Sequence, residues 1–237
     1  MSNWPLFIGI PLWFWLFILP ALLAVCARIF QQQARRILSP LWGFLDGVYM
    51  ASGIVAAGFM ILILLIIIGQ MIARWLGFTF EGSTEFAGYA MAATSFFAMA
   101  HALGRGAHIR VSIFLNLNAF TRLWLNAFAM WMAALVATYF ARFALKTNYM
   151  SEILNDRTQG QDQVPDSLLA ILQMFTSLPS EWGRIWAGAT GSLVYTPIWL
   201  PQLSMSFGTI LLAIALWDHL IRLLVLNESA IQSEVVR

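Results

Sequence analysis

Long uncharged stretches alternate with short polar ones along this chain. Nineteen residues without Asp, Glu, Lys or Arg separate Glu85 from Arg105, and nineteen more separate Arg122 from Arg142. At about 1.5 Å per residue, each stretch would form about 28 Å of helix, close to the roughly 30 Å of a bilayer's hydrocarbon core. Both stretches are therefore predicted to be transmembrane helices.

Three further uncharged runs predict spans at residues 4–27, between Asp46 and Arg74, and at residues 198–217. The run of 27 residues after Asp46 is about 40 Å long as a helix, so it would be tilted or extend into the headgroups. We expect an all-α integral membrane protein with five transmembrane helices, organised as a single membrane domain over residues 1–237.

The segments between these runs carry weaker signals. Residues 28–45 mix three arginines with an apolar stretch, which is typical of an interfacial segment leading into a span. Residues 151–194 are polar and rich in turn formers, but contain two apolar stretches of about eight residues each, at 168–175 and 182–189, which are too short to cross a bilayer. We expect interfacial or re-entrant helices there.

Small residues recur at helical spacing between Glu85 and Arg105. The pairs four residues apart are Gly88 and Ala92, Ala98 and Ala102, and Ala100 and Gly104. Small side chains let the backbones of neighbouring membrane helices approach closely. This span is therefore predicted to be a helix against which others pack.

Composition agrees with a membrane protein, because 60% of the residues are hydrophobic and 10% are charged, against about 25% charged in soluble domains. The net charge of +2 and the lack of a basic run interleaved with aromatic residues argue against nucleic-acid binding. The single cysteine, Cys26, excludes an intramolecular disulfide and a multi-thiolate metal site.

Charge also predicts orientation, since cytoplasmic segments of membrane proteins are enriched in Lys and Arg. With five spans and the N-terminus outside, the inner segments hold eight basic residues and four acids, and the outer segments hold five basic residues and seven acids. The N-terminus is therefore predicted to be periplasmic and the C-terminus cytoplasmic.

No Asp, Glu, Lys or Arg falls in the middle of a predicted span. Buried charges are costly in a membrane and usually mark a substrate or ion path, so the pattern argues against a proton relay or a charged-substrate site within this chain alone. The sequence also has no P-loop, HExxH or GxSxG motif and no paired catalytic carboxylates. No enzymatic activity is predicted.

His101, Arg105 and His108 would share one helical face if the helix continued past Arg105. A metal site would need a carboxylate or thiolate nearby, and a haem pair would need a second histidine at similar depth, for which His219 is the other residue available. Polar contacts at the membrane interface are the favoured interpretation. The basic turn from Gly104 to Arg110 has two interpretations that stay open, a headgroup anchor or a site for a partner chain or a specific lipid.

Three segments resemble one family of membrane proteins: GFTFEGSTEFAGYAM before and into a span, RGAHIRV after it, and TPIWLPQL at the start of the last span. Together, over about residues 40–225, they resemble the DctQ family, the small membrane subunit of tripartite ATP-independent periplasmic (TRAP) transporters. The resemblance implies four family helices, near residues 46–73, 86–103, 123–141 and 198–217. It also implies a large membrane subunit carrying substrate and sodium sites, and a periplasmic substrate-binding protein that delivers organic anions.

The span at residues 4–27 is additional to the family's pattern, and the outer segment at 151–194 is longer, like an insertion. The resemblance implies a non-catalytic, cofactor-free subunit of the bacterial inner membrane that scaffolds and anchors the large subunit for organic-acid uptake. Candidate positions for partner or membrane-lipid contacts are Glu85, Arg105, Gly106, His108, Ile109 and Arg110. The alternative hypothesis is a haem-bearing membrane anchor of a respiratory oxidoreductase.

Overall fold

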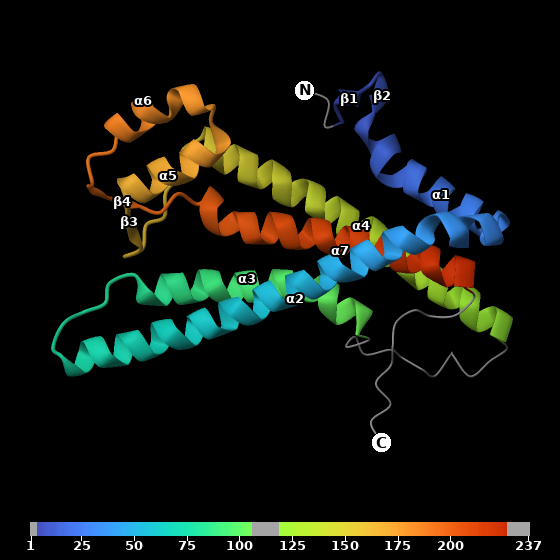
Figure 1. Ribbon diagram of the computed structural model, residues 1–237, viewed down its shortest axis with the longest axis horizontal. Coiled ribbons are helices and arrows are strands. Elements are labelled where there is room, and N and C mark those ends of the chain that lie inside the picture. Colours follow the sequence, from blue (N-terminus) through green and yellow to red (C-terminus); the bar gives the residue numbers. More distant parts are fainter. Residues whose placement is uncertain (1–3, 106–118, 227–237) are drawn as a thin grey trace.

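Helices dominate the computed structural model, which describes residues 4–105 and 119–226. Within those residues, four helices are long and apolar enough to cross a membrane. They are α2 (Gln31–Trp75), α3 (Ser83–Gly104), α4 (Ala119–Ile153) and α7 (Trp199–Leu226). Figure 1 shows them lying along one another in alternating directions. The prediction of an all-α membrane protein is confirmed.

The last helix, α7, is the centre of the bundle. It packs against α4 on one side and α3 on the other, whereas α2 packs mainly against α3. In the most apolar stretch of each helix, 67% of α7 is buried, against 22% of α3 and 11% of α2. Helix α3 is packed upon as predicted, but the helix most enclosed by the others is α7.

Helix α2 is a single helix of 45 residues, so the predicted interfacial segment at residues 28–45 lies largely within its beginning. It ends where Gly77 adopts a φ of 79°. The N–H of Phe78 donates to the carbonyl of Ala73 at 3.1 Å, and the N–H of Gly77 donates to that of Arg74 at 3.3 Å. This is the Schellman arrangement, in which a left-handed glycine satisfies the last carbonyls of a helix.

The predicted span at residues 4–27 is not one helix. It begins with a short hairpin of β1 (Leu6–Phe7) and β2 (Ile10–Pro11), followed by a π-helical stretch, Phe14–Ile18, and α1 (Leu19–Ile29). The continuous helical part, Phe14–Ile29, is 16 residues long, about 24 Å and short of a full crossing. The fifth transmembrane helix is therefore not confirmed.

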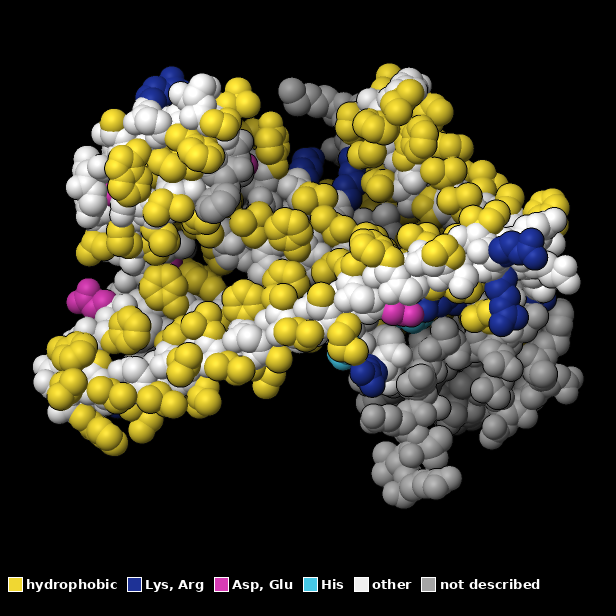
Figure 2. Space-filling view, viewed as in Figure 1, with side chains coloured by type: hydrophobic (Ala, Val, Ile, Leu, Met, Phe, Trp, Pro, Cys, Tyr) yellow, Lys and Arg dark blue, Asp and Glu magenta, His cyan; other side chains and the backbone are white. Residues whose placement is uncertain are grey.

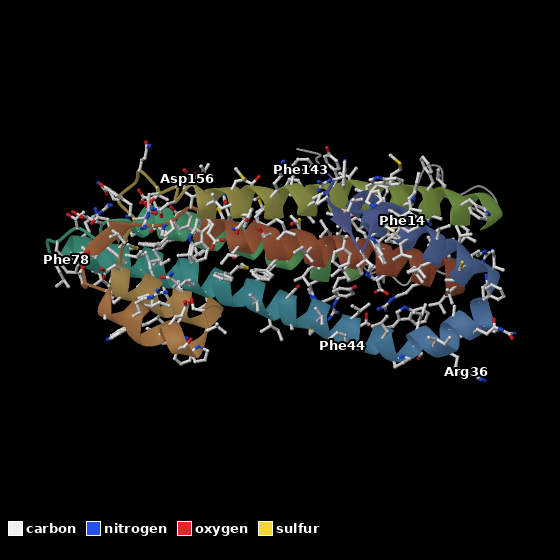
Figure 3. All side chains as sticks on the ribbon, turned by 90° about the horizontal axis from the view of Figure 1, so that it is seen from above. Phe14, Arg36, Phe44, Phe78, Phe143 and Asp156 are labelled. Atoms are coloured by element: carbon white, nitrogen blue, oxygen red, sulfur yellow. The ribbon has the colours of Figure 1, made fainter. Side chains whose placement is uncertain are left out.

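Residues 154–198 form a separate layer over one end of the bundle, which we call the cap. Strand β3 (Gln163–Pro165) pairs antiparallel with β4 (Leu193–Tyr195), and α5 (Asp166–Thr176) and α6 (Trp182–Ala187) lie between them in the chain. The two short helices predicted at 168–175 and 182–189 are confirmed as helices. In Figure 3, Asp156 and Phe78 lie at this end of the bundle and Arg36 lies at the other.

Candidate functional site

A buried ionic cluster joins α7 to α2 at the end of the bundle away from the cap. Nη2 of Arg222 lies 2.8 Å from Oδ1 of Asp46 and 2.8 Å from Oδ2 of Asp218. The same guanidinium donates from Nη2 to the carbonyl of Trp42 at 3.2 Å, and the hydroxyl of Tyr49 donates to Asp218 at 3.2 Å. One arginine is thus held between two carboxylates.

Helical spacing brings this cluster together. Asp218 and Arg222 are four residues apart on α7, and Trp42, Asp46 and Tyr49 follow one face of α2 at intervals of four and three. The side chains of Arg222 and Asp218 are 9% and 5% exposed, whereas Asp46 is 57% exposed. Charges buried this deeply in a bundle must be paired, so the cluster fixes the position of α7 relative to α2.

The sequence pattern missed this cluster. The uncharged runs place Asp46 just before one predicted span and Asp218 and Arg222 just after another. In the structure, however, Asp218 and Arg222 lie within α7, eight and four residues before its end. The sequence did hold one signal for it: Asp218 and Arg222 carry opposite charges four residues apart within an otherwise apolar segment. The correction is that this chain does carry buried charge within its helical bundle.

Glu85 lies at the cap end, where it contacts the cap rather than open surface. Its Oε1 accepts a hydrogen bond from the N–H of Gln161 at 3.2 Å. One turn along α3, the hydroxyl of Tyr89 donates to Oδ2 of Asp162 at 2.6 Å, and Asp162 is fully buried. A side chain at Gly82 would come within 2.9 Å of the cap backbone. The cap is therefore docked tightly on the beginning of α3.

The other candidate residues fall at or beyond the opposite end of α3. Arg105 is exposed and forms the C-cap of α3, with its N–H donating to the carbonyl of His101 at 3.2 Å. Gly106, His108, Ile109 and Arg110 lie outside the described residues. The proposed shared face of His101, Arg105 and His108 would require the helix to continue, and α3 ends at Gly104.

The two described histidines at this end pack against a glycine and an aromatic ring. The ring of His101 packs so closely on Gly53 of α2 that an added Cβ there would lie 2.7 Å away. His219 is buried beside Tyr49, with 6.1 Å between ring centroids. Within residues 4–105 and 119–226, no group of three or more His, Cys, Asp or Glu side chains could hold a metal ion.

The residues matched by a family model decide the protein class. Residues 63–178 match the model described as tripartite ATP-independent periplasmic transporters, DctQ component. Over these residues the sequence is that of the DctQ family. No curated protein and no solved structure matches it. The DctQ match runs from the second half of α2 through α3, α4 and α5, so it includes the first part of the outer segment.

The DctQ match and the four long helices together indicate a multi-pass membrane component of a transporter. The haem-anchor alternative gains no support from the match. The extra N-terminal segment, the ionic cluster and the last helix lie outside the matched residues of the DctQ model. The candidate residues drawn from the resemblance, from Glu85 to Arg110, lie within the match, and their role in assembly stays a prediction.

Within the cap, the carboxylate of Asp166 binds the loop at Thr190 and Gly191. Its carboxylate accepts hydrogen bonds from the Thr190 hydroxyl at 2.7 Å, the Thr190 N–H at 2.8 Å and the Gly191 N–H at 2.7 Å. Bonding to Thr190, first through its hydroxyl, lowers the pKa of the Asp166 carboxyl below its ordinary value. A lowered folded-state pKa means that the ionised carboxylate stabilises the folded loop.

We expect protonation or neutralisation of Asp166 to loosen the loop at Thr190 and Gly191. The stabilisation is complete above the unfolded pKa of about 3.9 and is lost as the pH falls through the lower folded pKa. Asp166→Asn should speed amide hydrogen exchange at these two residues at neutral pH, as measured by mass spectrometry. Asp156→Asn, which changes an exposed carboxylate of the cap, is the control. Equal exchange in both variants would contradict the assigned role of Asp166.

Proposed function

We propose that this chain is the non-catalytic small subunit of a TRAP-type secondary transporter, and that it scaffolds and anchors the large transport subunit. The family match supports a transporter component, and the four long helices support a stable membrane platform. By the family's organisation, its partners are the large membrane subunit and a periplasmic substrate-binding protein. The transported solute would be an organic acid.

The exposed face of α2 carries this proposal. Ile54, Ile61 and Leu65 are 66%, 60% and 59% exposed along one face of the helix, and Figure 2 shows hydrophobic side chains covering the outer surface of this helix. Glycines at positions 43, 47 and 58 leave open space where a side chain would stand. Membrane helices associate through surfaces of this kind, where small residues allow close approach.

The buried charges favour a structural role for this chain over transport by this chain alone. Arg222 is already paired with two carboxylates, and Asp218 also accepts from Tyr49. A carboxylate substrate would have to displace those partners to reach the arginine, leaving a buried acid without a counter-charge. The cluster is thus suited to holding helices together, and substrate passage is assigned to the large subunit.

Charge supports one orientation in the bacterial inner membrane. The end of the bundle opposite the cap carries Arg28, Arg35, Arg36 and Arg105, whereas the cap and its neighbouring loops are rich in acids. By the positive-inside rule, the cap faces the periplasm and the opposite end faces the cytoplasm. Glu85 then helps to orient the cap where a periplasmic binding protein docks.

Purification under mild conditions tests the assignment. The tagged chain should co-purify with a much larger multi-span protein in a fixed ratio, and liposomes holding the chain alone should take up no organic acid. Gly58→Trp should reduce recovery of the large protein, because its bulk would separate α2 from a partner. The control is Val136→Trp on α4, where the side chain is 65% exposed. Uptake by the chain alone, or full recovery with Gly58→Trp, would contradict the proposal.

A further inference from the structure

A large pocket of about 1000 Å³ lies between the N-terminal segment and the bundle. Its walls come from four parts of the chain: the N-terminal segment, α2, α4 and α7. Representative apolar residues are Leu12, Trp15, Leu38, Leu45, Ile210 and Ile214. A space of this size is at the upper end of ordinary ligand pockets, and the N-terminal segment that closes it lies outside the match to the family model.

Most polar groups in the wall are already satisfied within the protein. The Thr138 hydroxyl accepts a hydrogen bond from Nε1 of Trp217 at 3.0 Å, and Asp218 is bound by Arg222 and Tyr49. These groups need nothing from an occupant. Because a cavity with apolar walls does not hold ordered water well, its occupant along this length should be hydrocarbon.

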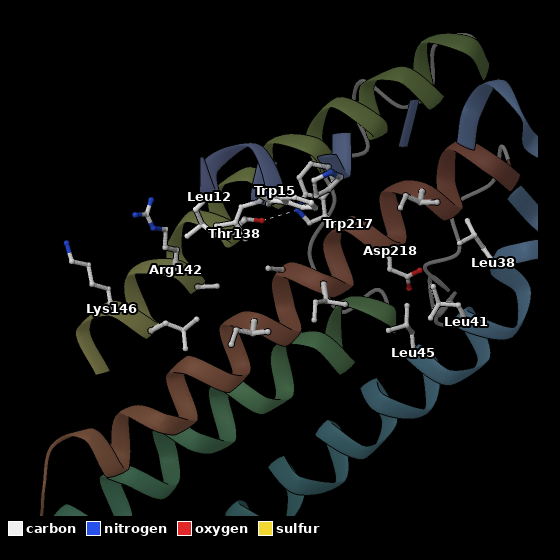
Figure 4. Close-up of a pocket in the computed structure, with 18 of the residues that line it drawn as sticks. Leu12, Trp15, Leu38, Leu41, Leu45, Thr138, Arg142, Lys146, Trp217 and Asp218 are labelled. Atoms are coloured by element: carbon white, nitrogen blue, oxygen red, sulfur yellow. Dashed lines mark hydrogen bonds between the residues drawn. The ribbon is translucent and has the colours of Figure 1, made fainter. Parts of the chain in front are cut away.

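One end of the pocket is different, because it is positively charged. Arg142 and Lys146 lie one turn apart on α4, and Figure 4 shows both at the end away from Asp218 and Leu38. The Arg142 guanidinium lies over the ring of Trp4, with its carbon 3.3 Å from the centroid. Among the described residues, its buried Nη1 atom has no hydrogen-bond partner. The aromatic ring holds the arginine in place and leaves the N–H groups of Nη1 available to an anion.

We propose that this pocket binds one anionic phospholipid, with its acyl chains along the apolar wall and its phosphate on Arg142 and Lys146. Arg142 precedes the end of α4 by eleven residues, about 16 Å of helix. Arg142 also ends the nineteen-residue uncharged run that is predicted as a span. Its expected place is therefore the outer edge of the hydrocarbon core, where a lipid phosphate lies, with the rest of α4 extending from there toward the cap. The lipid would join the N-terminal segment to α4 and α7. This site is separate from the family-derived candidates at Glu85 and Arg105, and it does not depend on the transport role.

Lipid binding can be measured by native mass spectrometry of the full chain, with any co-purifying subunit, after removal of endogenous lipid. The probes are dioleoylphosphatidylglycerol and dioleoylglycerol, which has the same tails without the phosphate. The natural chain should prefer the phospholipid. Arg142→Gln should weaken its binding about tenfold, the loss expected for one charged hydrogen bond, and leave dioleoylglycerol unchanged. Arg74→Gln, at an exposed arginine of α2, should change neither.

A second variant tests the apolar wall without altering the arginine. Ile214→Trp would fill part of the pocket and should weaken binding of both lipids, whereas Phe207→Trp, two turns earlier on α7 and 56% exposed, should not. Equal affinity of the natural chain for the two lipids would overturn the assignment of the phosphate to Arg142. Unchanged phospholipid binding in both Arg142→Gln and Ile214→Trp would overturn the site as a whole.

Discussion

Arg222→Met is expected to lower the free energy of unfolding of the bundle by about 3–5 kcal/mol, the usual cost of removing one partner of a buried ion pair. The variant would leave Asp218, whose side chain is 5% exposed, without its counter-charge. The carbonyl of Trp42 would also lose its donor. The loss can be measured by titrating the detergent-solubilised protein with SDS and following helicity by circular dichroism.

Two further variants distinguish the effect of losing the buried ion pair from the effect of removing any positive charge. Arg36→Met removes an exposed arginine from the same helix that supplies Asp46, and should change the midpoint little. Asp218→Asn combined with Arg222→Met removes the unpaired charge while keeping an acceptor for Tyr49, and should recover much of the loss. If Arg222→Met and Arg36→Met had the same midpoint, the cluster would not stabilise the bundle.

Charged residues predicted the helices well because they mark where apolar runs stop. Helix α3 begins two residues before Glu85 and ends just before Arg105, as the uncharged run indicated. The fourth helix was predicted to end near Arg142, yet α4 continues to Ile153. The distance between two charged residues predicts how much of a helix is apolar. The helix itself can continue beyond them, because backbone hydrogen bonds also form in polar sequence.

The N-terminal segment shows the limit of counting apolar residues. Hydropathy alone predicted a span at residues 4–27, although Pro5, Gly9 and Pro11 lie in its first third. Ile8 and Gly9 adopt positive φ angles of 52° and 76° and turn the chain between β1 and β2. Glycine and proline at this spacing were the local signal for a turn, and they outweighed the hydrophobic pattern.

The candidate site was less predictable than the fold, because burial of a charge depends on the neighbouring helix. The sequence places Asp218 and Arg222 near the end of an apolar run, and that position is equally compatible with a solvated edge. Only the packing of α2 against α7 puts Asp46 within 2.8 Å of Arg222. Glu85 was singled out from the family resemblance, but its contact with Gln161 depends on the fold of the cap.

Gly208→Leu is expected to lower the free energy of unfolding by about 3 kcal/mol, at the upper end of the cost of overpacking a core. Helices α3 and α7 approach so closely here that an added Cβ would lie 2.5 Å from the carbonyl oxygen of Phe96 and 2.6 Å from its carbonyl carbon. Both are backbone atoms, so no side-chain rotation relieves the contact. The helices must separate instead, which would weaken packing around the central helix.

The matched control is Gly88→Leu on α3, where an added Cβ would meet nothing within 4 Å. Both variants replace a helical glycine with the same better helix former, so the difference between their SDS midpoints isolates the clash. Gly88→Leu should be neutral or slightly stabilising. Equal midpoints would show that α3 can move away from α7 at little cost, and the close approach at Gly208 would then not determine where the two helices cross.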